Sequence, residues 1–236
     1  MPKRTRKSDP ASSASRSQKV TSGMEDYLKA IYRLEDADHL VSMAQLTTEL
    51  DVRGASVTNM IKRLSDLNLV TYEPYKGVML TDSGRKIALE IVRHHRLLEL
   101  YLSESLGMPW YEVHAEAELL EHHLSDELEA LMDSALGYPT HDPHGDPIPN
   151  AALEIHVDPG VNLTQVEPGV EGVVSRVSDR SREQLEYLGT LGVFPGERVA
   201  VLERMPFDGP LRVRIGGQEI LIGPAVARQV IVDTMP

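Results

Sequence analysis

Histidine and glutamate side chains recur at helical spacing in residues 110–132. His114, Glu118, Glu121 and His122 follow one another at intervals of four, three and one residues. At about 100° per residue, a helix would place all four within an arc of about 100° on one face. Neighbouring carboxylates repel and raise each other's pKa unless a cation lies between them. The spacing therefore predicts a divalent-cation site, and a solvated polar helix face is the alternative.

A second His–Glu pair precedes this segment. His95 and Glu99 lie four residues apart, so they share one face of the preceding predicted helix. No thiolate is available, because the chain has no Cys, and oxygen and imidazole donors suit Mn2+ or Fe2+. Intrinsic affinity would still favour Zn2+, Ni2+ or Cu2+. Other histidines lack partners at ligand spacing and are expected to be loop residues: His39, His141, His144 and His156.

The same residues do not predict an enzyme. The sequence places no evident nucleophile or general base beside an open metal position. A di-iron enzyme would need two Glu-x-x-His helices in a four-helix bundle, and this segment has none. We therefore expect a non-catalytic metal site, with a metallohydrolase as the weaker alternative.

The segment upstream predicts a winged helix-turn-helix. Three helical patterns precede two short strands joined by a turn-rich tip: residues 24–38, 43–50, 55–67, 69–73 and 78–81. In the third helix an apolar stripe is expected to be buried: Val57, Met60, Ile61 and Leu64. The opposite face is small, polar and cationic, which suits base edges and phosphates in a major groove. Candidate DNA-contacting residues are Arg53, Ala55, Ser56, Asn59, Lys62, Arg63 and Lys76. A helical hairpin with a merely solvated face is the alternative.

Charge is distributed unevenly along the chain. The formal net charge is −12, which on average disfavours nucleic acid. Residues 1–90, however, carry 14 Lys and Arg against 12 Asp and Glu, whereas residues 91–236 carry 10 against 24. Phosphate contacts need local cations rather than a positive total, so the first part can face DNA. The basic, Ser-rich residues 1–21 predict a disordered tail, with an accessory DNA-binding arm as the alternative.

The composition changes beyond residue 137. Four prolines within residues 137–150 exclude a helix or a central strand, so this segment is a boundary. Five short runs then predict a small β-barrel with a helical insert at residues 181–191: residues 172–177, 198–204, 211–215, 219–222 and 228–232. No apolar run approaches the length of a membrane span, and no hydrophobic segment follows the basic N-terminus. We therefore expect a cytoplasmic protein.

Four segments, in this order and spacing, resemble the diphtheria toxin repressor family of metal-dependent regulators: MEDYLKAIY (24–32), RHHRLLE (93–99), VHAEAELLEHHLSD (113–126) and PHGDPIP (143–149). The resemblance covers about residues 22–236. It implies a mainly α fold with a small β part, in which a winged helix-turn-helix precedes a helical dimerisation domain and an SH3-like small β-barrel. The expected domain boundaries are 1–21 (tail), 22–90 (DNA-binding), 91–137 (metal-binding and dimerisation), 138–160 (Pro-rich linker) and 161–236 (SH3-like).

The resemblance also implies two metal sites per subunit. The primary site would use Asp26, Glu118, Glu121 and His122, and the ancillary site would use His95, Glu99, His114 and Gln184. The iron-responsive branch of the family has Met and Cys at the positions of Asp26 and Glu118. Because hard carboxylate oxygen replaces soft sulfur at both positions, the ligand set favours Mn2+ over Fe2+.

Two residues depart from the family pattern. Ser181 stands where the family has Glu, with Asp179 nearby, so the contribution of the third domain to the ancillary site stays open. Lys29 stands where a manganese-type relative has Glu. An ammonium group beside Asp26 disfavours a two-metal cluster and favours two separate single-metal sites.

The resemblance implies a homodimeric, Mn2+-activated transcriptional repressor that binds a palindromic operator and controls metal-uptake genes, without a membrane or a small-molecule substrate. A metal ion at Asp26 would join the DNA-binding domain to the helical domain and fix the paired recognition helices. Two alternatives stay open: an Fe2+-responsive repressor of the same family, and a winged-helix regulator that senses a small organic effector.

Overall fold

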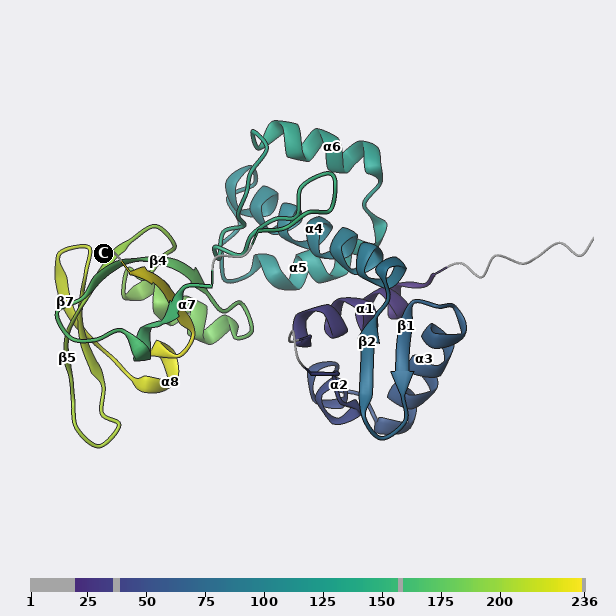
Figure 1. Ribbon diagram of the computed structural model, residues 1–236. Helices are drawn as coiled ribbons and strands as arrows, with labels where there is room; N and C mark the ends of the chain where they lie inside the picture. The colour runs from purple at the N-terminus through teal and green to yellow at the C-terminus, as the bar shows by residue number, and fades with distance from the viewer. Residues whose placement is uncertain (1–19, 36–38, 157–158, 235–236) are drawn as a thin grey trace, which may run out of the picture.

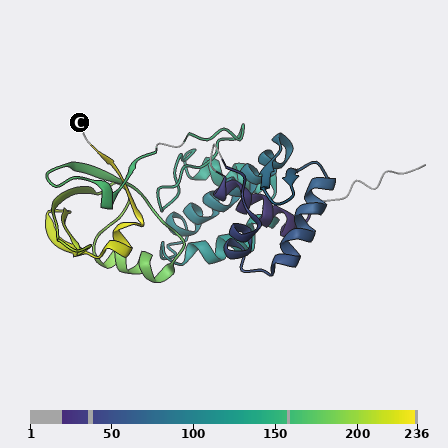
Figure 2. The same ribbon diagram turned by 60° about the horizontal axis from the view of Figure 1, so that its bottom comes forward.

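The computed structural model describes residues 20–35, 39–156 and 159–234, and the chain forms three parts (Figure 1). A helical part with one hairpin comes first, a helical part follows it, and a β-rich part ends the chain. Both views show the first and last parts at opposite ends of the middle one (Figure 2). The predicted basic tail lies almost wholly outside the described residues.

The first part has the predicted winged helix-turn-helix topology. Its elements are α1 (Ser22–Leu34), α2 (Met43–Glu49), α3 (Gly54–Asp66), β1 (Val70–Glu73) and β2 (Gly77–Leu80). The predicted stripe of α3 packs into the core through Val57, Ile61 and Leu64, while Met60 is only partly buried. A reciprocal cap fixes the start of α2, because Ser42 N–H donates to Gln45 Oε1 (2.9 Å) and Gln45 N–H donates to Ser42 Oγ (3.2 Å).

The middle part is built on one long helix. Its elements are α4 (Asp82–Glu104), α5 (Val113–Leu120), η1 (Glu121–His123) and α6 (Asp126–Ala135). Thr81 Oγ1 caps α4 by accepting a hydrogen bond from Gly84 N–H (3.1 Å). Because α4 also packs against α1, it links the first two parts. Within the described residues, no helix combines the length and apolar character needed to cross a membrane.

One predicted helix is broken in the structure. The sequence predicts continuous helix through residues 110–132, but α5 ends at Leu120 and the chain tightens into the single 3₁₀ turn η1. Leu124 is then extended, and Ser125 caps α6 by accepting a hydrogen bond from Leu128 N–H (3.3 Å). Glu121 and His122 therefore lie on a turn rather than on the face of α5.

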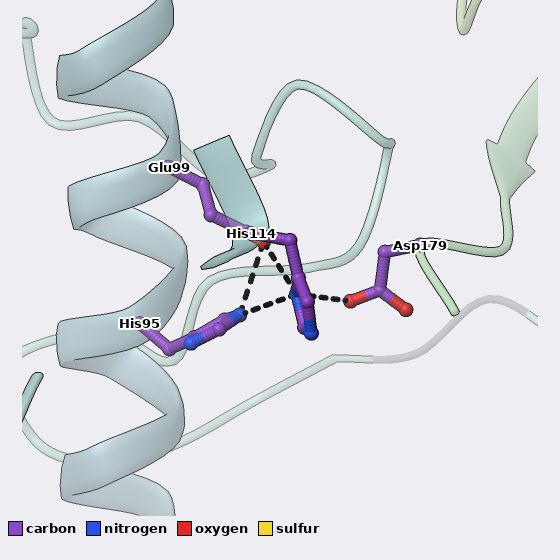
Figure 3. A group of neighbouring side chains, drawn as sticks. All are labelled: His95, Glu99, His114 and Asp179. Carbon is purple, nitrogen blue, oxygen red and sulfur yellow. Dashed lines mark hydrogen bonds and ion pairs between the residues drawn. The ribbon is translucent and has the colours of Figure 1, made fainter. Parts of the chain in front are cut away.

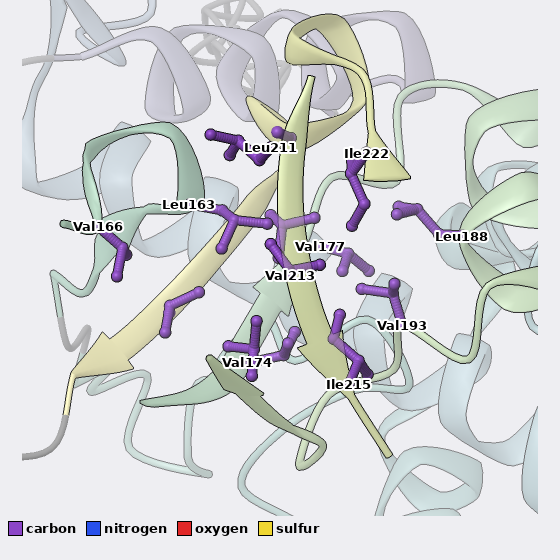
Figure 4. Packing of buried hydrophobic residues seen from close by; sticks show 14 of the residues in the cluster. Leu163, Val166, Val174, Val177, Leu188, Val193, Leu211, Val213, Ile215 and Ile222 are labelled. Carbon is purple, nitrogen blue, oxygen red and sulfur yellow. The ribbon is translucent and has the colours of Figure 1, made fainter. Parts of the chain in front are cut away.

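The last part is one antiparallel sheet of order β3-β8-β4-β5-β6-β7. Its elements are β3 (Val161–Asn162), η2 (Leu163–Gln165), β4 (Glu171–Val177), α7 (Arg182–Thr190), β5 (Arg198–Arg204), β6 (Leu211–Ile215), β7 (Gln218–Ile222), α8 (Pro224–Ala227) and β8 (Val230–Thr234). The sheet curls around an apolar core that includes Leu163, Val174 and Val213 (Figure 4). The sheet is SH3-like, but it does not close into the predicted barrel. The edge strand β3 is only two residues long, and β7 at the opposite edge pairs with no further described strand.

The last part docks on the middle part through Trp110 and the Pro-rich segment. The ring centroids of Trp110 and Phe194 lie 5.0 Å apart, and those of Trp110 and His144 lie 5.6 Å apart. Val177 N–H donates to the carbonyl oxygen of His144 (2.9 Å) at the end of β4. These contacts bring Asp179, two residues beyond β4, against the middle part.

Candidate metal centres

Two histidines and two carboxylates from three segments converge where the last part meets the middle part (Figure 3). This ancillary group consists of His95 and Glu99 on α4, His114 on α5, and Asp179. Glu99 Oε1 lies 3.0 Å from His95 Nε2 and 3.1 Å from His114 Nδ1. His114 Nδ1 also lies 3.3 Å from Asp179 Oδ2. One potential ligand atom from each residue fits within a span of 4.8 Å, which suits coordination of one ion.

Protons occupy the ancillary group when no cation is bound. Burial lowers the pKa of His114, but its hydrogen bonds to Asp179 and Glu99, and their charges, outweigh burial and raise the pKa to about 10. Burial opposes ionisation of Asp179, yet the bond to His114 holds its pKa below the ordinary range. An imidazolium thus stands where a cation would lie. A metal ion must displace this proton, so its affinity rises with pH.

We expect metal-free protein to lose stability as pH rises from about 6.5 to about 10. Below pH 6.5, the ordinary pKa, His114 is protonated in folded and unfolded chains and its ion pairs contribute fully. That contribution disappears as the pH passes the raised folded-state pKa. Urea unfolding across this range measures the loss, and His114→Gln should reduce the slope. A flat or rising profile for the unsubstituted protein would contradict this expectation.

A second group joins the first two parts of the chain. This primary group consists of Asp26 near the start of α1, with Glu121 and His122 on η1. His122 Nε2 lies 2.8 Å from Asp26 Oδ1 and 3.7 Å from Glu121 Oε1. The other ring nitrogen of His122 lies 2.7 Å from Glu25 Oε2, which orients the imidazole. Burial is the main cause of the raised pKa of Asp26, and a cation would relieve that cost.

Lys29 lies between these two groups. Its ammonium nitrogen donates to Glu118 Oε1 and to both oxygens of Glu121, each at 2.7 Å. It also lies 3.2 Å from His95 Nδ1, and only 3% of the residue is exposed. His95, Glu118 and Glu121 form a potential metal group of their own, and the lysine fills its centre. The ammonium supplies the positive charge that a metal ion would supply there.

A fourth group was missed by sequence reasoning. Glu99, Asp142 and His144 are all buried and close enough to share an ion, although the sequence predicts His144 to be a loop residue without partners. Glu99 Oε2 and His144 Nδ1, 3.7 Å apart, are buried without a hydrogen-bond partner among the described residues. The only sequence signal for Asp142 and His144 was the neighbouring PHGDPIP motif (143–149), which carried the family resemblance but predicted no ligand. The two orphaned atoms extend the ancillary group and fit a cation.

The predicted ligands are distributed as follows. Glu118 lies beside the primary group, where Lys29 binds it. Gln184 is the third residue of α7, where its N–H donates to the capping Ser181 Oγ (3.3 Å). The structure brings Asp179 to His114, and the role of Gln184 as a ligand stays a prediction.

The predicted DNA-reading face is exposed. These residues line the outer side of α3 and its N-terminal end: Arg53, Ala55, Ser56, Asn59, Lys62 and Arg63. At the tip of the hairpin, Tyr75 is fully exposed and has a positive φ of 66°. Lys76 beside it pairs with Glu73 (2.7 Å) and keeps 72% of its side chain exposed. The helix face and the hairpin tip are thus both free to reach a duplex.

Three family models match the chain in sequence order. The N-terminal DNA-binding domain of iron-dependent repressors matches residues 19–78, and their metal-binding and dimerisation domain matches residues 81–150. The FeoA domain model matches residues 161–234. Together they cover all three parts of the fold.

Relatives match almost the whole chain. The iron-dependent repressor IdeR of Mycobacterium tuberculosis is 32% identical over 89% of this chain and 96% of its own length. The diphtheria toxin repressor of Corynebacterium efficiens is 29% identical over 75% of this chain and 82% of its own. A manganese-dependent transcriptional repressor solved with manganese is 38% identical, with a TM-score of 0.83 over 90% of this chain and 100% of its own. This chain therefore belongs to the diphtheria toxin repressor family and is a metal-dependent transcriptional repressor, not an enzyme.

Proposed function

We propose that the chain is a cytoplasmic, homodimeric repressor that Mn2+ activates. It binds a palindromic operator and controls metal-uptake genes. The observation that carries this proposal is the composition of the primary group. Asp26 comes from α1 of the DNA-binding part, whereas Glu121 and His122 come from the middle part. One ion bound by all three would join the DNA-binding part to the rest of the subunit.

The bridge explains activation by an equilibrium argument. Without metal, the DNA-binding part of each subunit can adopt several orientations, and ordering them costs free energy when DNA binds. A metal ion at the primary group selects one orientation before DNA is met. Linkage then requires operator DNA to tighten metal binding by the same factor by which metal tightens DNA binding.

The choice of Mn2+ rests on the donor atoms. Asp26, Glu118 and Glu121 offer carboxylate oxygen, His122 offers imidazole, and the chain has no Cys. Oxygen-rich sites suit Mn2+ better than they suit softer metal ions. The intrinsic affinity order of divalent metals, the Irving–Williams series, would still favour Zn2+. A manganese-bound neighbour of known structure supports the choice, while cadmium- and zinc-bound neighbours show that related sites accept other ions. Fe2+ is the competing physiological metal.

We propose two ions per subunit. One occupies the primary group, with Glu118 as a further ligand, and the other occupies the ancillary group, with Asp179 as the ligand from the third domain. Lys29 keeps the two apart, because its ammonium holds the carboxylates that a third ion would share.

An exposed apolar strip on α6 supports the dimer. It consists of Leu128 and Leu131, which lie three residues apart on one helix face and are 48% and 62% exposed. A second copy of the chain would bury this strip, in agreement with the match of this region to a dimerisation domain. A two-fold dimer requires half-sites about one helical turn apart or a multiple of it.

A gel-shift assay on a palindromic operator tests the proposal. Free Mn2+, Fe2+ and Zn2+ are buffered separately, and we expect binding to rise with Mn2+ at concentrations where Fe2+ has less effect. Stronger activation by Fe2+ would reassign the metal. Operator binding that is unchanged by chelator would overturn metal activation and favour a sensor of an organic effector.

Asp179→Asn should remove the ancillary ion but leave the primary one. The amide loses the charge that neutralises a cation beside His114, while the shape of the side chain is kept. Equilibrium dialysis should show the Mn2+ stoichiometry falling by one ion per chain. Asp208→Asn, at an exposed loop, is the matched control. An unchanged stoichiometry in Asp179→Asn would remove Asp179 from the ligand set.

Arg63→Ala should weaken operator binding without changing Mn2+ affinity. The side chain lies on the exposed face of α3 and belongs to none of the ligand groups, so its loss is expected to remove a base or phosphate contact. Loss of a base-edge contact costs about 1–3 kcal/mol, whereas loss of a phosphate contact also reduces the salt dependence of binding. Titrations at several salt concentrations separate the two. Lys86→Ala, exposed on α4, is the control, and equal loss of both affinities in Arg63→Ala would make Arg63 structural.

A further inference from the structure

Arginine side chains crowd around a cavity of about 510 Å³ where all three parts of the chain meet. Those that line it are Arg33, Arg85, Arg96, Arg176, Arg180 and Arg228. The whole chain has 24 Lys and Arg and a net charge of −12, so a quarter of its cations line one cavity of an acidic protein. Three carboxylates line the same cavity: Glu35, Asp146 and Asp179. Cations therefore outnumber anions by two to one.

Three of the six arginines are already engaged. Arg85 pairs with Glu35. Arg96 donates to the carbonyl oxygen of Pro147 (2.5 Å) and lies 3.5 Å from Asp146 Oδ1. Arg176 reaches that same oxygen at 3.6 Å. One carboxylate thus serves two guanidinium groups, and the described lining residues offer no unpaired carboxylate to the other arginines.

The other three arginines are poorly compensated. Arg33 has its nearest carboxylate oxygen on Glu118 at 3.9 Å, and Lys29 already holds that oxygen at 2.7 Å. Arg180 is exposed and reaches Glu49 only at 3.5 Å. Arg228 has no ion pair within the described part of the chain. Asp179 lies close enough to Arg33 to interact with its charge, but it already pairs with His114 in the ancillary group.

The geometry points to a binding site for a small polyphosphate anion in this cavity. Guanidinium groups present rigid pairs of donors that match phosphate oxygens, and several of them can share one anion. The cavity is within the size range of small-molecule sites and much larger than one phosphate group. Arg33 comes from the first part of the fold and Arg180 and Arg228 from the last part, so linked phosphates would be needed to reach all of them. A bound polyphosphate would tie α1 to the third domain.

Calorimetry on the full-length, metal-free protein in EDTA tests this inference. Tripolyphosphate, ATP and sulfate are titrated at one ionic strength. We expect saturable 1:1 binding of tripolyphosphate, tighter than that of sulfate. ATP binding as tight or tighter would identify nucleoside polyphosphates as the occupants, whereas tripolyphosphate binding alone would identify inorganic chains. Because metal is absent, failure here leaves the proposed function untouched.

The double variant Arg180→Gln and Arg228→Gln should weaken tripolyphosphate binding by about ten-fold or more, since charge-assisted hydrogen bonds are lost. Arg212→Gln is the matched control, because Arg212 lies in the same domain but pairs with Glu203 (2.6 Å) away from the cavity. The inference is overturned if neither polyphosphate binds, if sulfate binds as tightly, or if the double variant keeps its affinity.

Discussion

We expect Glu121→Gln to abolish Mn2+-dependent operator binding. Glu121 is fully buried, shares a potential ligand group with Asp26 and His122, and accepts hydrogen bonds from Lys29. It therefore belongs to the primary group and to the lysine-filled one. Glutamine keeps the size of the side chain but cannot carry the charge that neutralises the cation. Replacing an outer partner of a metal ligand already costs about 10–100-fold in affinity, and loss of a ligand should cost at least as much. Equilibrium dialysis and gel shift measure the two losses separately.

Glutamine is preferred to alanine at this position for a structural reason. Alanine would leave the Lys29 ammonium buried with fewer acceptors, and breaking a buried ion pair costs about 3–5 kcal/mol. Unfolding could then be mistaken for loss of metal. Glu116→Gln, exposed on the preceding helix α5, is the matched control. If Glu121→Gln folds, dimerises and still responds to Mn2+, the primary group is wrongly assigned.

Local spacing predicted most of the residues that meet in the structure, but not how they meet. His95 and Glu99 are one helical turn apart on α4, so their proximity follows from sequence alone. Glu121 and His122 do approach Asp26, yet from a 3₁₀ turn rather than from the predicted helix face. The helix breaks because Ser125 caps the start of α6, which competes with continuation of α5. The helical pattern of the sequence is continuous here and does not show which of the two wins.

Contacts between distant segments were the harder part. Nothing local links His144 to Glu99, because their approach depends on where the Pro-rich segment packs against Trp110. Docking of the third domain likewise brings Asp179 to His114, five residues before the predicted ligand Gln184 in the chain. The curled sheet was predicted as a closed barrel, because the number and length of the strands are typical of one. Whether the edge strands pair depends on the tertiary fold, which the sequence pattern does not show.

Lys29→Glu should add a third ion to each chain. The ammonium now binds Glu118 Oε1 and both oxygens of Glu121, and His95 Nδ1 lies 3.2 Å away. Glutamate at this position would place a third carboxylate among these groups and remove their only buried cation. Repulsion would destabilise the metal-free protein, and Mn2+ would relieve it. The variant should therefore unfold more easily in EDTA and gain more stability from Mn2+ than the unsubstituted chain.

Stoichiometry and spectroscopy distinguish this result from simple damage. Equilibrium dialysis should show one additional Mn2+ per chain. Electron paramagnetic resonance should show coupling between neighbouring ions in Lys29→Glu and uncoupled ions in the unsubstituted protein. Lys86→Glu makes the same charge change at an exposed position of α4 and should alter neither measurement. An unchanged ion count in folded Lys29→Glu would mean that the lysine is only a structural ion-pair partner, and that something other than its charge keeps the metal sites apart.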